Sequence, residues 1–121
     1  MKLTNNEIYS YAQQLSALNI GDIKMPVRIN FFLQKNMQVI AAAGQEIDVA
    51  RTAIVAQFGE LNNEGTMYVV PPEKMVEAQK ELNDLFALEQ ELNIHVFNID
   101  DFDGIELTVQ QLSALMFMIE E

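Results

Sequence analysis

The chain has 121 residues, of which half are hydrophobic and 21% are charged, so it can bury the core of one domain and should not be disordered. It contains no Cys, no Trp and one His, which excludes disulfides, cysteine nucleophiles and thiolate metal sites. Eighteen acidic residues against seven basic ones give a formal net charge of −11, which disfavours direct binding to nucleic acid or to an anionic membrane. No signal-peptide-like stretch and no apolar run of about 18 residues occurs. We therefore expect one soluble, cytoplasmic domain over residues 1–121.

The first helix is predicted to begin at Thr4. Thr4 and Glu7 have the spacing of a capping box, in which each side chain satisfies a backbone N–H of the other residue. Apolar residues from Ile8 to Leu18 then recur on one face. Gly21 suits the left-handed position that follows a helix, so we expect the helix to end there.

A long second helix is predicted over residues 27–58. Pro26 fits its first turn, the segment contains no further Pro and one Gly, and Gly59 is expected to end it. An apolar stripe continues for more than four heptads. Its members are Leu33, Ile40, Ile47 and Ile54 at a spacing of seven, with Met37, Ala43 and Ala50 in the alternate layer.

The predicted length of this helix exceeds the expected size of the domain. About 33 helical residues span roughly 50 Å. A compact chain of this length has a radius of gyration of about 13–14 Å, and therefore a diameter near 35 Å. The helix must overhang, bend or pack against a second copy. We favour self-association through the stripe residues Leu33, Met37, Ile40, Ile47 and Ile54. The alternative is a bend at Gly44, where the helix is weakest by about 1 kcal/mol.

The second half of the chain alternates short strands and helices. We predict a turn over 60–65, a strand over 66–70, a helix over 72–92 and a strand over 94–99 that pairs with 66–70. The inward side chains of the helix are expected to be Met75, Ala78, Leu82, Leu85 and Phe86.

A terminal helix is predicted to open at a second capping box, Thr108 to Gln111. The apolar run 115–119 that follows is expected in the core, with an interface role as the alternative. The fold class is α+β and helix-dominated. We expect about four helices, including one long central helix, and a small two- or three-stranded antiparallel sheet.

The charge is unevenly distributed along the chain. Residues 1–59 have five basic and four acidic side chains, and residues 60–121 have two and fourteen, so the halves carry +1 and −12. Such skew favours an acidic face that binds a basic groove of another protein. The alternative is an ordinary solvated helix surface. The candidate residues are Glu73, Glu77, Glu81, Asp84, Glu89 and Glu91.

Three basic residues near the start of the long helix form a second candidate site. Lys24, Arg28 and Lys35 are spaced by four and seven, beside a helix N-terminus that attracts anions. A phosphate or small nucleotide is one hypothesis. The favoured alternative is that these residues pair with the acidic half, within one chain or between chains.

Sites for chemistry are not expected. The carboxylates of residues 100–106 do not match the register of a calcium loop. His95 lies between apolar neighbours in a predicted strand, so alternation places it at the surface. The serines Ser10, Ser16 and Ser113 have no adjacent base. We therefore predict no catalytic residues, no metal, no cofactor and no enzymatic activity.

Four segments together show a resemblance to a known family. They are KMPVRINFFLQKN at 24–36, ELNDL at 81–85, DFDGIEL at 101–107 and MIEE at 118–121. In this order they resemble a family of small uncharacterised proteins encoded by phages and prophages of Gram-positive bacteria. The resemblance covers nearly the whole chain and implies a phage origin. Its motifs contain no catalytic residues, so it implies no activity.

The sequence therefore favours a non-enzymatic, phage-encoded interaction protein. We expect it to bind and inhibit or sequester a host defence factor, for example a nucleic-acid-binding protein, in the cytoplasm of the bacterial host. Two alternatives stay open. One is a structural or tail-assembly accessory protein of the virion, and the other is an oligomer that sequesters a nucleotide signal.

Overall fold

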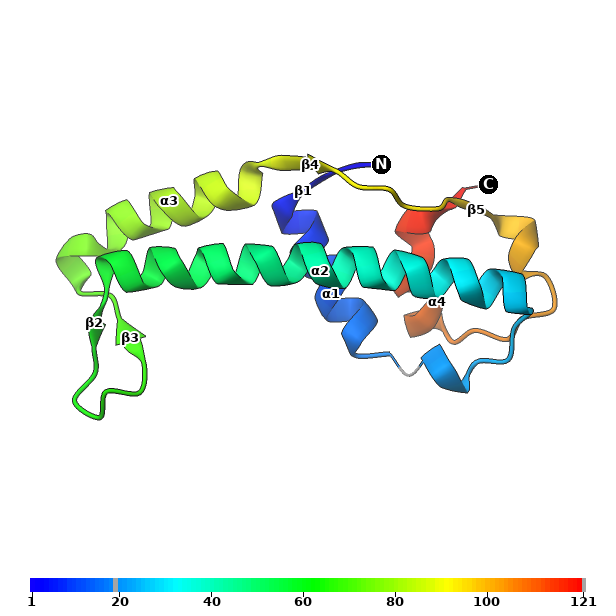
Figure 1. Ribbon diagram of the computed structural model, residues 1–121, viewed down its shortest axis with the longest axis horizontal. Coiled ribbons are helices and arrows are strands. Elements are labelled where there is room, and N and C mark those ends of the chain that lie inside the picture. Colours follow the sequence, from blue (N-terminus) through cyan, green and yellow to red (C-terminus); the bar gives the residue numbers. More distant parts are fainter. Residues whose placement is uncertain (19, 121) are drawn as a thin grey trace.

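One uninterrupted helix, α2 (Val27–Phe58), runs from one end of the molecule to the other (Figure 1). Its 32 residues span about 48 Å at 1.5 Å per residue. The computed structural model describes residues 1–18 and 20–120. The predicted long helix and its end before Gly59 are confirmed, whereas Pro26, expected in its first turn, precedes the helix as the N-cap residue. The alternative of a break at Gly44 is wrong, because helical structure continues through it.

The remaining elements are short. The other α-helices are α1 (Asn5–Ser16), α3 (Met75–Ala87) and α4 (Val109–Leu115). Single 3-10 turns are η1 (Ile20–Asp22), η2 (Pro72–Lys74), η3 (Ile99–Phe102) and η4 (Met116–Met118). The strands are β1 (Lys2–Thr4), β2 (Glu60–Leu61), β3 (Tyr68–Val69), β4 (Glu89–Glu91), β5 (Phe97–Asn98) and β6 (Ile119–Glu120). Across the described residues the predicted class, α+β with four helices and one long central helix, is confirmed.

Both predicted capping boxes are present. The Thr4 hydroxyl oxygen accepts a hydrogen bond from the Glu7 N–H at 3.1 Å, and the Glu7 carboxylate accepts one from the Thr4 N–H at 3.0 Å. Thr108 and Gln111 exchange the same pair of bonds at the start of α4. The predicted role of Gly21 is wrong. Helix α1 ends at Ser16 with Ala17 as its right-handed C-cap, and Gly21 lies inside η1.

The predicted strand pairing is wrong. β3 pairs with β2, its neighbour in sequence, because Asn62 closes the hairpin between them. The Asn62 N–H donates to the Met67 carbonyl at 2.9 Å, and the Asn62 side chain accepts from the Thr66 N–H at 3.0 Å. Helix α3 then returns along α2, so that β5 lies at the far end of the molecule from β3 (Figure 1).

Sequence reasoning missed two strand pairs that join the chain ends to its middle. β1 pairs antiparallel with β4, and β5 pairs parallel with β6. Each pair brings together segments more than 20 residues apart, for which a single sequence offers no signal. The third predicted helix, residues 72–92, is accordingly shorter than expected, since its last residues form β4.

The hydrophobic core occupies one end of the molecule, which we call the head. It consists of α1, the first two thirds of α2 and residues 94–120, and it includes Leu115 and Met118 from the terminal apolar run. Three predicted self-association residues, Leu33, Ile40 and Ile47, are at most 2% exposed inside this core. They are not available to a second copy. Met37 and Ile54 are half-buried.

Gly44 allows α1 to cross α2 at close range. A Cβ atom at Gly44 would lie 3.0 Å from the Cβ of Ala12, which is tighter than most such contacts. The glycine therefore serves helix packing. The weakness it brings to α2 is offset by the contact with α1.

A buried polar side chain connects α2 to the segment around His95 in the head. Asn36 is 1% exposed, and it lies on the buried face of α2 between Leu33 and Ile40. Its amide nitrogen donates to the His95 carbonyl at 2.8 Å, and its amide oxygen accepts from the His95 N–H at 2.8 Å. One side chain thus satisfies both backbone groups of a residue outside any strand.

The prediction of a surface His95 in a strand is wrong. The imidazole is half-buried, stacks on Phe32 with ring centroids 4.1 Å apart, and meets the edge of Phe97 at 4.8 Å. The alternation of inward and outward side chains in a strand does not apply to His95, because β5 begins only at Phe97.

Replacing Asn36 by Ala should lower the free energy of unfolding by about 2 kcal/mol, since it leaves the N–H and C=O of His95 without their partner. Urea denaturation followed by circular dichroism would measure the change. Asn93→Ala, at an exposed position two residues from His95, is the control and should have little effect. Equal midpoints for both variants would contradict this role of Asn36.

Candidate interaction surface

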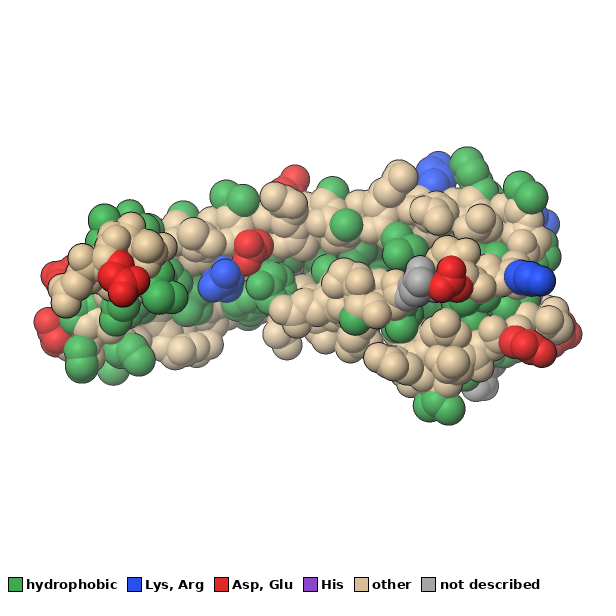
Figure 2. Space-filling view, turned by 90° about the horizontal axis from the view of Figure 1, so that it is seen from below, with side chains coloured by type: hydrophobic (Ala, Val, Ile, Leu, Met, Phe, Trp, Pro, Cys, Tyr) green, Lys and Arg blue, Asp and Glu red, His purple; other side chains and the backbone are tan. Residues whose placement is uncertain are grey.

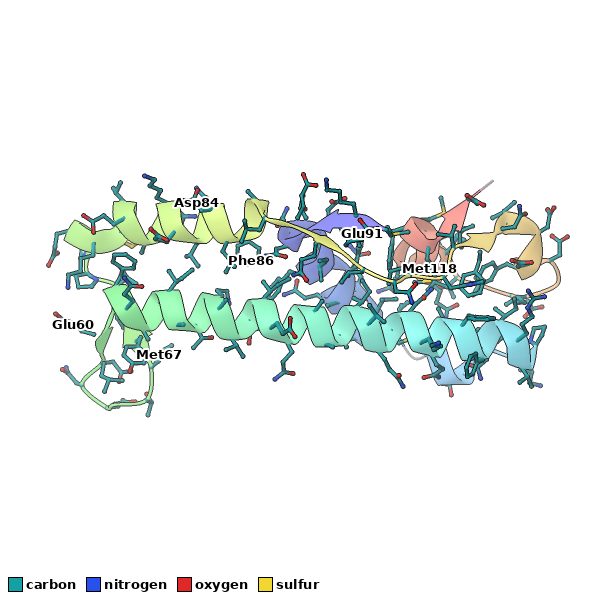
Figure 3. All side chains as sticks on the ribbon, turned by 45° about the horizontal axis from the view of Figure 1, so that its top comes forward. Glu60, Met67, Asp84, Phe86, Glu91 and Met118 are labelled. Carbon is teal, nitrogen blue, oxygen red and sulfur yellow. The ribbon has the colours of Figure 1, made fainter. Side chains whose placement is uncertain are left out.

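The other end of the molecule is an arm without a closed core. It consists of residues 48–93, namely the last third of α2, the β2–β3 hairpin, α3 and β4. Ala78 is the one residue of this range that is buried. α3 packs on α2 through half-buried side chains, including Phe86, which faces α2 in Figure 3, whereas Asp84 lies on the opposite side. Of the inward residues predicted for α3, Met75 is instead 55% exposed.

Large apolar side chains gather at the end of the arm. We call this group the apolar tip, and each member is between 43% and 81% exposed. Its members are Leu61, Met67, Tyr68, Val69, Met75 and Val76. Figure 2 shows hydrophobic atoms concentrated at this end of the molecule. Sequence reasoning identified the hairpin segment only as a turn and a strand, because exposure depends on what packs against it.

Four predicted acidic residues form a second feature of the arm, the acidic ridge. Glu73 lies in η2, and Glu77, Glu81 and Asp84 follow at helical spacing in α3, so that the last three share one side of that helix. All four are exposed. None belongs to an ion pair among the described residues. These carboxylates are therefore exposed charges without an ion-pair partner in the described part of the chain.

The other two predicted acidic residues have structural roles. Glu89 pairs with Lys2 at 3.2 Å, and Glu91 pairs with the N-terminal ammonium group at 3.0 Å. Both lie in β4 beside β1, where they support the strand pairing. The structure therefore separates them from the acidic ridge.

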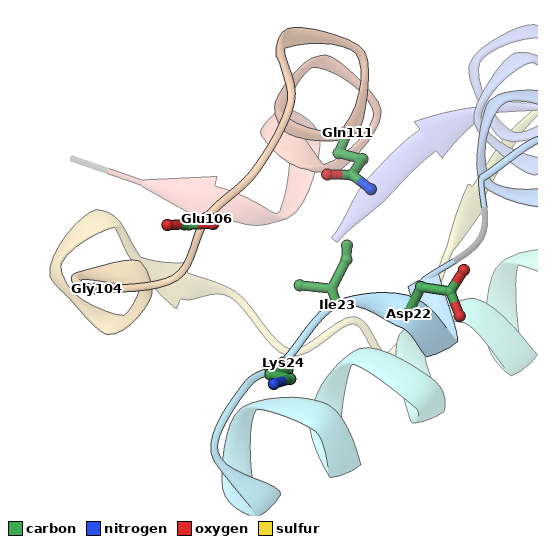
Figure 4. Close-up of a pocket in the computed structure, with 6 residues that line it drawn as sticks. All are labelled: Asp22, Ile23, Lys24, Gly104, Glu106 and Gln111. Atoms are coloured by element: carbon green, nitrogen blue, oxygen red, sulfur yellow. The ribbon is translucent and has the colours of Figure 1, made fainter.

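The three basic candidates are all exposed but do not share one cavity. Lys24 lines an open cleft of about 550 Å³ together with Asp22, Glu106 and Gln111 (Figure 4). Two carboxylates beside one ammonium group make this cleft a poor phosphate site. Arg28 and Lys35 lie outside it, on the solvent side of α2.

Lys35 and its neighbour Phe31 form a small exposed pair. The Lys35 ammonium nitrogen lies 5.7 Å from the centroid of the Phe31 ring, within the range of a cation–π contact. The ring is itself 56% exposed. A cation and an apolar ring are thus presented together near the start of α2.

A hydrogen-bonded cluster joins the arm to the head. The Tyr9 hydroxyl of α1 donates to Asp48 Oδ1 at 3.1 Å, and Arg51 donates to the same oxygen from Nη2 at 2.9 Å and from Nε at 3.1 Å. The hydrogen bond from Arg51, followed by that from Tyr9, lowers the pKa of Asp48 below its ordinary value. The same hydrogen bond raises the pKa of Arg51. On the other side of α1, burial and the nearby Glu7 raise the pKa of Tyr11.

Comparisons with known proteins do not assign this chain to a family. No protein-family model, curated protein or solved structure matches it. Among the described residues, no helix is long and apolar enough to cross a membrane, and no three potential metal ligands lie together. Any indication of function therefore comes from the surface of this chain.

The cluster around Asp48 should make stability depend on pH. The pKa of Asp48 is lower in the folded than in the unfolded state. The ionised Asp48 carboxylate therefore stabilises the fold above about pH 4, and this contribution is lost as the pH falls through the folded-state pKa. The stability difference between wild type and Asp48→Asn should therefore shrink between about pH 7 and pH 3. Urea denaturation at both values would measure it.

Asp103→Asn is the matched control for this comparison, because Asp103 is exposed on the head and its carboxylate forms no ion pair among the described residues. Its stability difference from wild type should change little with pH. An Asp48→Asn difference that stays constant with pH would contradict the proposed role of the cluster.

Proposed function

We propose that the protein is a non-enzymatic, phage-encoded interaction protein that binds and inhibits or sequesters a host factor in the bacterial cytoplasm. The observation that supports this most directly is the arm, in which Ala78 is the one buried residue between positions 48 and 93. The resemblance to small phage proteins adds the origin. Self-association of the chain is a further part of the proposal.

The apolar tip supports a binding role. Folded monomers rarely expose contiguous apolar patches, and such patches with a polar rim are typical of interaction sites. Met67 and Met75 add flexible, polarisable side chains that adapt to a partner. Ordering this hairpin and keeping its side chains in water disfavours folding, so burial against a partner would recover free energy.

The acidic ridge indicates the chemistry of the partner. Solvated carboxylates on one helix side produce a negative potential that steers a basic surface towards the arm. A pocket with an apolar floor and a rim of Lys and Arg would match both the tip and the ridge. Nucleic-acid-binding proteins present such basic surfaces, and an acidic arm would compete with their ligand.

Reversing the charge of the acidic ridge should weaken capture of the host factor at least about tenfold, since it replaces attraction by repulsion at three positions. The variant is Glu77→Lys, Glu81→Lys and Asp84→Lys. The partner would be identified by affinity capture from infected cells and mass spectrometry, and its binding to the purified variants measured at two salt concentrations.

The control carries the same change of charge on the head. Asp103→Lys, Glu106→Lys and Glu120→Lys alter exposed carboxylates far along the chain from the ridge. Circular dichroism would establish that both variants fold. Equal binding by the two variants would refute the ridge, and recovery of the chain from purified virions would instead favour the assembly alternative.

A further inference from the structure

The molecule exposes more surface than its mass requires. Its accessible surface is 8115 Å², whereas a folded monomer of 13.7 kDa typically exposes about 6600 Å². The excess is about 1500 Å². Stable homodimers bury roughly 1000 Å² or more from each copy. The excess is therefore as large as the surface that one copy contributes to such an interface.

One side of α2 is uncovered from Val27 to Ala53. Exposed residues recur there at spacings of four and seven, opposite the buried positions of Leu33, Ile40 and Ile47. We call this side the uncovered face. Six of its residues are Val27, Phe31, Lys35, Ala42, Val49 and Ala53. In Figure 1 α2 passes in front of α1 and α4.

The charges along α2 differ between its two ends. Lys24, Arg28 and Lys35 lie at or before its first turns, whereas Glu46 lies in its second half and Glu60 lies two residues beyond its end. All five side chains are exposed, and none is in an ion pair among the described residues. Two parallel copies would bring like charges together. Two antiparallel copies bring opposite charges together.

We propose that a second copy of this chain covers the uncovered face, with the two α2 helices antiparallel and a two-fold axis near Ala42. Full overlap of two helices spanning 27–58 places the axis at their middle, where small side chains at Ala41 and Ala42 permit close approach. Lys24 then lies opposite residues 60–61 of the second copy. Lys35 lies within about one turn of the second copy's Glu46.

This dimer replaces the self-association surface expected from the sequence and leaves the acidic ridge accessible. The expected residues are in the core of the head, whereas the uncovered face lies on the opposite side of the same helix. Asp84 of the ridge points away from α2 (Figure 3). The dimer and the binding of a host factor are therefore separate proposals, and either can fail without the other.

Sedimentation equilibrium at micromolar concentration should give 27.4 kDa, twice the chain mass of 13.7 kDa. Val49→Glu should shift the chain to 13.7 kDa, because it places a charge in the interface. Val49 is 62% exposed in one copy, so the fold should survive. Val109→Glu is the matched control at an 84% exposed valine on α4 and should remain dimeric.

Charge reversal at one pair tests the orientation. Lys35→Glu and Glu46→Lys should each weaken the dimer about tenfold, since each produces two like-charge contacts across the axis. An equimolar mixture of the two variants should restore it, because both contacts become attractive. Failure of the mixture to recover the dimer would overturn the antiparallel arrangement.

The absence of cysteine permits a direct test of the axis. In the Ala42→Cys variant, the new thiols of the two copies face each other across the proposed axis and should oxidise to a disulfide-linked dimer. In the Val27→Cys variant the two thiols lie at opposite ends of the helix pair and should not. Cross-linking of both variants would indicate parallel helices and refute the proposal. A wild-type mass of 13.7 kDa, or a mass that increases without limit with concentration, would also refute it.

Discussion

The burial of one stripe of α2 is the contact on which the rest of the structure depends. Leu33, Ile40 and Ile47 are almost fully buried. They pack with α1 and the C-terminal segments in a core that contains nearly all of the buried apolar residues. A helix of about 48 Å is longer than that core. Its last third therefore leaves the head and is covered only by α3 and the β2–β3 hairpin. The elongated shape follows from this difference in length.

This arrangement also explains where the free surface lies. Two helices and a two-stranded hairpin cannot enclose a core, so the apolar residues of the arm other than Ala78 are at best half-buried. The acidic residues that the chain concentrates in its second half are then presented on an element with few internal contacts. The features that the arm exposes are the apolar tip and, along α3, the acidic ridge.

Polar side chains supply the connections that apolar packing does not. Asn36 holds the segment around His95 to α2, and the buried Asn5 joins α1 to the end of α3 by donating to the Leu85 carbonyl at 2.9 Å. Tyr9, Asp48 and Arg51 do the same at the junction of head and arm. These bonds link elements that are distant in sequence, and those of Asn5 and Tyr9 connect the head to the arm.

Local patterns in the sequence by themselves determined that the helices form and where α1 and α4 begin, but not where α1 and α3 end. The capping boxes at Thr4 and Thr108 and the uninterrupted stripe from 27 to 58 depend on neighbours within a few residues, and the structure has all of them. Only the tertiary structure decided the strand pairs, the burial of Asn36 and His95, and which face of α2 stays exposed. Each of these depends on segments that meet across tens of residues. The charge skew was visible in composition, but its division into a solvated ridge and the paired Glu89 and Glu91 required the position of β1 beside β4.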